Sequence, residues 1–314
     1  MAHLHRILSA GLVLLAAPVA GQQVAVKVTD GNQHKATDIL VGDRAVKRIG
    51  MLAFRWDLSV QQIRKDFENR EAVGGGLTKV TWGTHVSEVQ LTPALLQAMT
   101  DQMYDDLVAE LGKQRTVVGI EQIQQVPAYQ RVGKAIPALT GAEAWAASSW
   151  DLGARGSNSL GGLATGIKMT QDDKLGSELQ RGCNCDALLF TTIKSTLGQK
   201  GKAKVDGVPG IWLEVGSLLD TRVLVGFDQA TAAAEALGKR VQKINKMNHV
   251  VAFNASDGSL KLFVPGGSAK EMAGVPDEKV VAVFRSHFIE PMLAFSKAYA
   301  AGVATAIGER YPRQ

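Results

Sequence analysis

The stretch LTPALLQAMTDQMYDDLVAELGKQRTVVGI, residues 91–120, decides the fold of this chain. Thr92 is a good N-cap, and Pro93 suits the first helical turn because the N–H that proline lacks has no helical partner there. Apolar residues then recur at every fourth position, and this spacing predicts one buried face of an α-helix. These positions are Leu95, Met99, Met103, Leu107 and Leu111, with Leu96 and Val108 beside them.

The same stretch predicts how this helix meets a β-sheet. Its opposite side carries acidic and amide side chains, among them Asp101 and Asp105. Gly112 follows the last apolar position, where a left-handed residue commonly ends a helix. Residues 116–120 are rich in β-branched side chains and indicate a short strand. We therefore expect an amphipathic helix that packs on a sheet and leads directly into one of its strands.

The rest of the chain indicates the same fold class. Strands are expected at 24–28, 46–54, 77–89, 186–195, 211–215 and 220–227, helices at 59–69 and 228–247, and a turn at 200–210. Residues 254–258, Asn-Ala-Ser-Asp-Gly, predict a hairpin turn. A last helix begins near Pro276, and Pro291 should kink or divide it. The expected fold is α/β (α+β), a mixed β-sheet with amphipathic helices packed on it and a long kinked C-terminal helix.

Residues 151–182 are unusually rich in glycine. The segment is too glycine-rich for a core helix and too long for a simple connection. We expect a surface loop, with a partner-binding or membrane-touching hairpin and a ligand cradle as alternatives. The expected organisation is a signal peptide at 1–21, an α/β domain at 22–275 with this insertion, and a C-terminal helical segment at 276–314.

The first 21 residues predict a secretory signal peptide. Arg6 precedes an apolar run at 7–17, and small residues surround a cut after Gly21. The run is shorter than the roughly 20 residues that span a bilayer. We therefore expect an exported protein of the periplasm or the cell exterior. Loss of Arg6 lowers the formal charge from +5 to +4, and this mild, dispersed charge gives no support to a nucleic-acid partner.

The two cysteines lie close together, as Gly-Cys-Asn-Cys-Asp at 182–186. In an oxidising compartment a disulfide between Cys183 and Cys185 is expected. Residues i and i+2 of an extended strand are too far apart to bridge, so the bond needs a tight turn, which Gly182 and Asn184 would permit. Unpaired structural thiols remain the alternative, and a metal site would need further ligands.

Few residues are candidates for catalysis. The histidines after the signal are His34, His85, His249 and His287. Residues 157–161, Ser-Asn-Ser-Leu-Gly, lack the first glycine of a nucleophile elbow, and Gly74-Gly75-Gly76 lacks the lysine of a phosphate loop. The sequence therefore predicts no catalytic residue, cofactor or metal ligand. Two alternatives stay open: an exported hydrolase that uses Ser157 or Ser159 with His249 or His287, and a periplasmic solute-binding protein.

Four basic residues gather in the second half of the helix expected at 228–247. They are Lys239, Arg240, Lys243 and Lys246. Basic side chains suit the C-terminal end of a helix dipole. A solvated face and a partner surface are both consistent with this pattern.

Three segments carry a resemblance to a known family. Residues 49–54 resemble an "AVLxF" strand, 96–121 a helix and strand of the form "LTDxLxxxLxxxGxFxVVxR", and 185–193 a "GADxxVxGxI" strand. Residues 220–223 and 254–260 resemble a later strand and hairpin. This order, over residues 46–264, is similar to the CsgG-like family of the curli secretion channel and its relatives, the TolB amino-terminal domain and LpoB-like periplasmic lipoproteins.

The resemblance implies a non-enzymatic envelope protein that acts through protein–protein contacts in assembly, secretion or an accessory role. A protein partner or self-association is then expected, and the family brings no catalytic residues to this chain. The chain lacks the lipid-attachment cysteine of the channel members. Contact with a membrane stays an open alternative.

Overall fold

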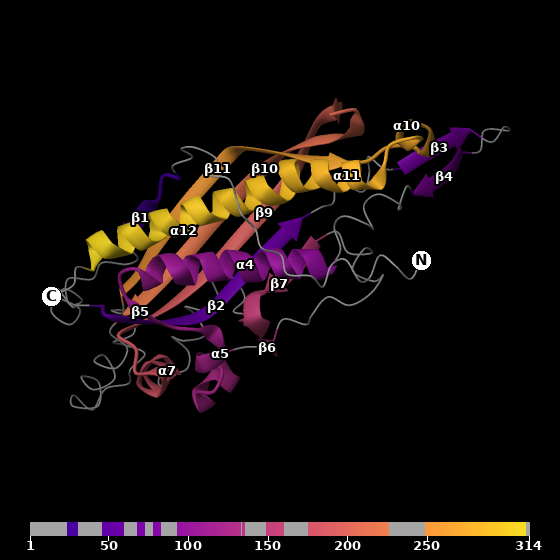
Figure 1. Cartoon of the computed structure of the whole chain (residues 1–314). Helices are drawn as coiled ribbons and strands as arrows, with labels where there is room; N and C mark the ends of the chain where they lie inside the picture. The colour runs from indigo at the N-terminus through magenta and orange to yellow at the C-terminus, as the bar shows by residue number, and fades with distance from the viewer. Residues whose placement is uncertain are drawn as a thin grey trace.

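The computed structural model describes residues 24–30, 46–59, 68–72, 78–82, 93–132, 134–135, 149–159, 175–225 and 249–311. Its main feature is a seven-stranded mixed sheet (Figure 1). The strand order is β1 (Lys27–Asp30), β11 (His249–Pro265), β10 (Val208–Val225), β9 (Ala187–Val205), β2 (Arg48–Ser59) and β5 (Thr116–Val118), with β7 (Ser149–Gly153) also on β2. Strand β2 is parallel to β5 and β9, and the other pairs are antiparallel.

Two short antiparallel pairs lie outside this sheet. Strand β3 (Glu68–Ala72) pairs with β4 (Thr78–Trp82), and β6 (Lys134–Ala135) pairs with β8 (Asn158–Ser159). With the helices described next, this arrangement confirms the expected α/β class and its mixed sheet.

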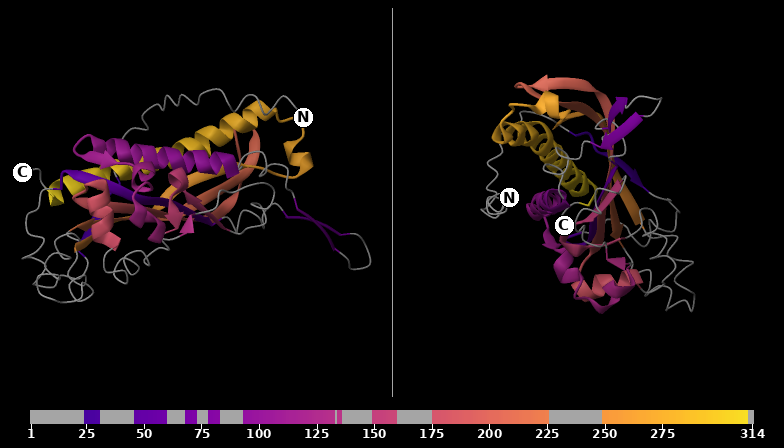
Figure 2. Two further views of the ribbon diagram at one scale, coloured as in Figure 1. Left: turned by 90° about the horizontal axis from the view of Figure 1, so that it is seen from below. Right: turned by 90° about the vertical axis from the view of Figure 1, so that its right-hand side faces the viewer.

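Two long helices cover one face of the sheet. Helix α4 (Pro93–Gly112) and helix α12 (Glu290–Arg310) run side by side there (Figures 1 and 2). The apolar stripe predicted for α4 faces this core: Leu96, Met99, Met103, Leu107 and Leu111 are at most 2% exposed, and Leu95 and Val108 are half-buried. Complete burial of such a side chain contributes about 1.5–3 kcal/mol, so this face is a main source of stability.

Smaller helices cover part of the other face. They are α5 (Ile120–Ile123), the 3-10 turn η2 (Pro127–Arg131) and α7 (Leu175–Cys183). Leu175 and Leu179 of α7 pack with Leu188 and Phe190 of β9 in a second apolar cluster. Further along β9 and β10 the same face becomes polar, with Lys194 exposed. A sheet of antiparallel strands tolerates water on one face.

The C-terminal helical segment is one continuous helix of 34 residues that contains a π-helical turn just before Pro291, so it is not divided there. Helix α11 (Asp277–Phe284) passes into a π-helical turn, η5 (Arg285–Ile289), before α12 begins. Proline offers no N–H and its ring crowds the carbonyl four residues earlier. The wider turn just before Pro291 accommodates both effects, and the N–H of Glu290 donates to the Arg285 carbonyl. Helix α10 (Ala269–Met272) precedes this segment.

The hairpin predicted at 254–258 is wrong. Strand β11 runs through these residues without a turn, and Asn254 pairs with Asp220 of β10. Ser217 faces Asp257 while Val215 faces Leu260, so β11 holds one residue more than β10 there. The turn-like residues therefore form a β-bulge, because pairing with a long neighbouring strand outweighs their local preference.

Other boundaries also differ from the sequence expectations. The turn expected at 200–210 is only Asp206–Gly207, both with positive φ as a two-residue hairpin requires. Gly112 ends α4 without a left-handed conformation. Ser59, the expected start of a helix, is the last residue of β2, and Glu68 and Asn69, its expected end, begin β3.

The glycine-rich segment is only partly what we expected. Its first residues form the edge strand β7, and its last residues form helix α7, whose Gly176 and Ser177 are buried. The prediction of a surface loop is therefore wrong at both ends. Several predictions lie outside the described residues: the signal peptide at 1–21, the basic group Lys239, Arg240, Lys243 and Lys246, the glycine triplet at 74–76, and His34 and His85. None of the described helices is long and apolar enough to cross a membrane.

Replacement of Tyr299 by Phe should lower the free energy of unfolding by about 1–3 kcal/mol. The buried Tyr299 hydroxyl lies 2.9 Å from Thr221 Oγ1 and 3.0 Å from the Phe253 carbonyl, and its removal takes away this buried hydrogen bond. Denaturant unfolding measures the change. Thr305→Ala on the exposed side of the same helix should change stability by less than about 0.5 kcal/mol. Equal effects of the two substitutions would contradict the role given to Tyr299.

Candidate functional site

The three parallel strands of the sheet define a topological switch point. The connection from β2 to β5 contains α4, which lies on one face, and the connection from β5 to β9 contains α5, η2 and α7, which lie on the other. Where chain connections leave neighbouring parallel strands toward opposite faces, a crevice opens at the carboxyl ends of the strands. In this protein that position is the carboxyl end of β5, beside β2.

The protein's own chain fills this position. The outer edge of β2 pairs with β5 at Arg48–Gly50 and with β7 at Arg55–Ser59. Between them, the Leu52 carbonyl accepts a hydrogen bond from the Tyr129 hydroxyl at 3.2 Å, and the Phe54 carbonyl accepts one from Ser157 Oγ at 2.9 Å. Side chains therefore satisfy backbone groups that a neighbouring strand would otherwise pair.

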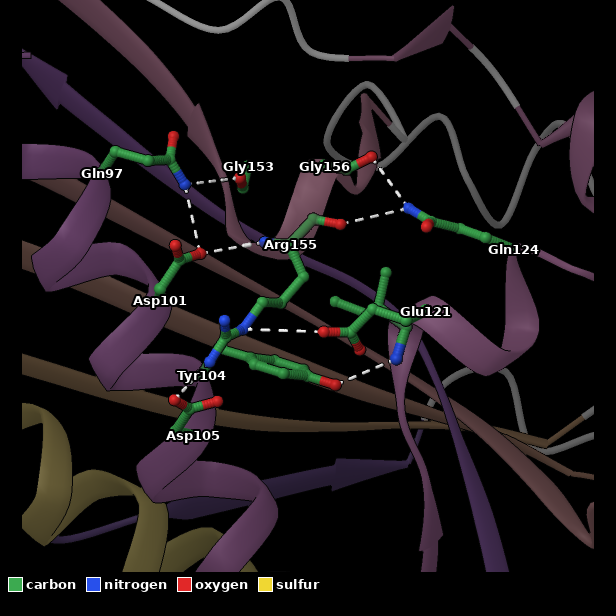
Figure 3. A network of polar contacts seen from close by, with 10 residues as sticks. Gln97, Asp101, Tyr104, Asp105, Glu121, Gln124, Gly153, Arg155 and Gly156 are labelled. Carbon is green, nitrogen blue, oxygen red and sulfur yellow. Dashed lines mark hydrogen bonds and ion pairs between the residues drawn. The ribbon is translucent and has the colours of Figure 1, made fainter. Parts of the chain in front are cut away.

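Five side chains, four from α4 and α5 and one from the residue that follows α5, hold the turn η4 (Ala154–Gly156) after β7 (Figure 3). We name this group the cradle, and it consists of Gln97, Asp101, Asp105, Glu121 and Gln124. Three of its members contact the main chain. Gln97 Nε2 donates to the Gly153 carbonyl at 3.0 Å, and Asp101 Oδ1 accepts from the Arg155 N–H at 2.9 Å. Gln124 Nε2 lies 3.2 Å from the Arg155 carbonyl and 2.9 Å from that of Gly156.

The remaining two members hold the side chain of Arg155. Its guanidinium lies 2.6 Å from Asp105 Oδ2 and 3.7 Å from Glu121 Oε1. The hydrogen bond to Asp105 raises the pKa of Arg155, so its charge is permanent. Arg155 also has a left-handed backbone, with φ 51° and ψ 35°. Because this conformation costs a non-glycine residue about 1–2 kcal/mol, the cradle offsets a local strain.

Tyr104 joins the cradle to the end of β5. Its hydroxyl accepts a hydrogen bond from the Ile120 N–H at 2.9 Å, and the side chain is 3% exposed. Burial raises the pKa of Tyr104 to about 12. A side chain at Gly119 would place its Cβ 3.1 Å from this hydroxyl and 3.2 Å from Glu121 Oε2, so glycine leaves the space that both groups need.

Strand β7 and the turn η4 form one segment, and this segment is also held at its β7 end. Asp151 of β7 forms an ion pair with Arg55 of β2, and Asp57 lies 3.9 Å from the same guanidinium. Between the two charged ends, Leu152 and Ala154 are buried in the main core. Residues 151–157 are therefore held by packing in the middle and by charges at both ends.

The structure joins Cys183 and Cys185 in a disulfide, with their Cα atoms 5.3 Å apart. Asn184 between them has a positive φ of 51°, so the tight turn that the bond requires is present. The pair lies where α7 passes into β9. Next to it, Asp186 Oδ2 accepts hydrogen bonds from the N–H groups of Lys47 and Arg48 at 2.8 Å. Through these two hydrogen bonds the carboxylate connects the start of β9 to the start of β2.

The serine and histidine candidates are not brought together among the described contacts. Ser157 is fully buried, and its hydroxyl is used by the Phe54 carbonyl. His287 lies in the π-helical turn, with Nδ1 2.7 Å from Ser286 Oγ and its ring near Trp212. Ser159 ends β8 and His249 begins β11. Within the described part of the chain, no three His, Cys, Asp or Glu side chains are placed to hold a metal ion.

The sequence did not reveal the cradle because contacts between its members and the turn they hold span up to 56 positions. One signal was present: Gln97, Asp101 and Asp105 repeat at every fourth position along the polar side of α4. That spacing places them in one row, but nothing local shows that Arg155 lies against the row.

Comparison with known proteins adds no relative. No family model matches this chain, and neither the curated proteins nor the solved structures contain a match. The resemblance to the CsgG-like group thus stays a prediction that depends on the order of the elements.

Replacement of Tyr104 by Phe should give a stability difference from the wild type that depends on pH. At pH 8 the wild type should be more stable by about 1–2 kcal/mol, because the variant leaves the Ile120 N–H unpaired. In the unfolded chain tyrosine ionises near pH 10, whereas folded Tyr104 stays protonated to about pH 12. Wild-type stability is therefore lost as pH rises through this range.

Urea unfolding at pH 8, 10 and 11.5 tests this expectation. The stability advantage of the wild type over Tyr104→Phe should shrink as pH rises from 10 toward 12. An advantage that stays constant across this range would show that the hydroxyl has an ordinary pKa.

Proposed function

We propose that this chain is a non-enzymatic, exported protein of the cell envelope that acts by binding another polypeptide. The observation that carries the proposal is the cradle, which holds a main-chain segment through side-chain amides and a carboxylate. Contacts to backbone N–H and C=O groups give affinity in many modes of peptide recognition. The cradle also occupies the position at which open α/β sheets commonly bind their ligands.

The order of the elements supports the same proposal. Strand β2, helix α4, strand β5 and strand β9 follow one another in the order on which the resemblance to the CsgG-like group rests. That group implies assembly, secretion or an accessory role, carried out with a protein partner or with further copies of the chain. Fold-level similarity alone never assigns function, so direct evidence of contact is needed.

Site-specific photo-crosslinking in the producing cells tests the proposed contact. A photoreactive residue at Gln122, which is exposed beside the cradle, should give an adduct of discrete mass. The same residue at Thr305, exposed on helix α12 and outside the cradle, serves as the matched control and should give none. Adducts from neither position, together with a monomer by sedimentation, would contradict the proposal.

The mature protein should begin at Gln22. The basic start, the short apolar run and the small residues before this position are the features that signal peptidases recognise. Intact mass and N-terminal sequencing of the protein from an envelope fraction measure the cleavage. A chain that keeps residues 1–21 and stays in the cytoplasm would overturn the proposed location.

A further inference from the structure

We propose that Cys183 and Cys185 form a reversible redox pair, which a dithiol reduces and a disulfide re-forms while the fold stays intact. This inference goes beyond the proposed function, because it needs no polypeptide bound at the cradle. The observation that carries it is the turn between α7 and β9, which holds both cysteines through main-chain hydrogen bonds that do not involve sulfur.

The bond closes a very short loop. The two cysteines are two positions apart in the sequence, within a single turn. A disulfide restricts the unfolded chain more when the loop that it closes is longer, so this one restricts it little. It also joins no elements that would otherwise separate, since the main chain already connects α7 to β9. The fold therefore does not need this bond as a cross-link.

The turn has its own hydrogen bonds. The N–H of Cys185 donates to the Gln180 carbonyl at 2.8 Å, and the N–H of Asn184 donates to the Arg181 carbonyl at 3.1 Å. With the left-handed backbone of Asn184, these two bonds form a Schellman motif, a common way for a helix to end. Asparagine is one of the few residues that adopt this conformation readily. We therefore expect the reduced chain to keep the same turn.

Contacts with β2 and β9 fix the turn from both sides. Arg48 Nε donates to the Cys183 carbonyl at 3.3 Å, and the N–H of Asp186 donates to the Arg48 carbonyl at 2.9 Å. Gln180 Nε2 donates to the Asp186 carbonyl, also at 2.9 Å. In a turn held this way the Cα atoms of the two cysteines stay 5.3 Å apart, within the range that a disulfide spans.

The turn lies at the protein surface. Arg181, Gly182 and Asn184 are exposed, and neither cysteine is completely enclosed, with exposed fractions of 7% and 9%. The rate of thiol–disulfide exchange depends on access to the sulfur that is attacked. Because helix ends fray, local opening at the end of α7 gives a reagent more access without unfolding the sheet.

The exchange moves one pair of electrons. A thiolate of the dithiol attacks one sulfur of the protein disulfide, and the other protein sulfur leaves as a thiolate. The second thiolate of the reductant then displaces the first protein sulfur from the mixed disulfide. The reductant becomes a disulfide, and the protein gains two electrons and two protons. In the reverse reaction the closing step is intramolecular, and the turn keeps the effective concentration of the second thiol high.

Alkylation of the full chain under native conditions tests the proposal. Millimolar dithiothreitol without denaturant, followed by an alkylating reagent, should give adducts at both cysteines by intact mass, with an unchanged far-UV circular dichroism spectrum. The thermal midpoint should fall by no more than about 5 °C, because the loop is short. Oxidised glutathione should then restore the bond. Reduction that needs denaturant, or loss of the native spectrum on reduction, would overturn the proposal.

Two substitutions at Asn184 provide a matched control for the turn. Asn184→Gly keeps the left-handed conformation at no steric cost, so the equilibrium between dithiol and disulfide in glutathione should stay within about threefold of the wild type. Asn184→Val opposes this conformation, so the equilibrium should shift about tenfold toward the dithiol. Equal equilibria in the two folded variants would show that the turn does not bring the sulfurs together, and would contradict the inference.

A comparison of reductants identifies the exchange partner. Reduced thioredoxin, a protein dithiol, and dithiothreitol are compared at equal thiol concentration. Faster reduction by the protein dithiol assigns a polypeptide as the partner, slower reduction assigns a small dithiol, and no reduction by either overturns the inference. Crosslinks from Gln122 without native reduction would remove only the redox pair. Native reduction without crosslinks would remove only the proposed protein contact.

Discussion

The burial of β2 on both faces is the constraint on which the rest of the structure depends. Trp56 and Leu58 point into the core beneath α4 and α12, whereas Leu52 and Ala53 point into the cluster covered by α5 and α7. A strand that is apolar on both sides needs a layer above and a layer below it. The two crossover connections supply these layers, and their departure toward opposite faces places the topological switch point beside β5.

The same constraint explains why other segments of the chain pair with the outer edge of β2. A buried strand cannot leave its carbonyls unpaired, and β5 covers only three residues of its outer edge. The hydroxyls of Tyr129 and Ser157 pair the Leu52 and Phe54 carbonyls, and β7 pairs with the following residues of β2. The cradle that positions the turn after β7 is thus both part of this closure and a surface that holds a peptide segment by specific contacts. We see the proposed recognition of another polypeptide as an extension of this structural role.

Whether a prediction from the sequence agrees with the structure depends on how far apart in the sequence the interacting residues lie. The apolar stripe of α4 was predicted correctly, and the strand expected at 116–120 forms over Thr116–Val118, because each depends on residues close to one another in sequence. The hairpin at 254–258 and the loop at 151–182 were wrong, because pairing with β10 and β2 overrides local turn preference. The cradle was not predicted at all.

The sequence alone determined the class of the fold and the buried side of its central helix, since hydrophobic periodicity reports directly which residues leave water. It also led to the prediction of no catalytic residue, because few histidines follow the expected signal peptide. Only the tertiary structure decided that Arg155 lies between Asp105 and Glu121. The contact with Asp105 joins residues 50 positions apart, and its geometry is set by how the crossovers pack on β2, which no local pattern encodes.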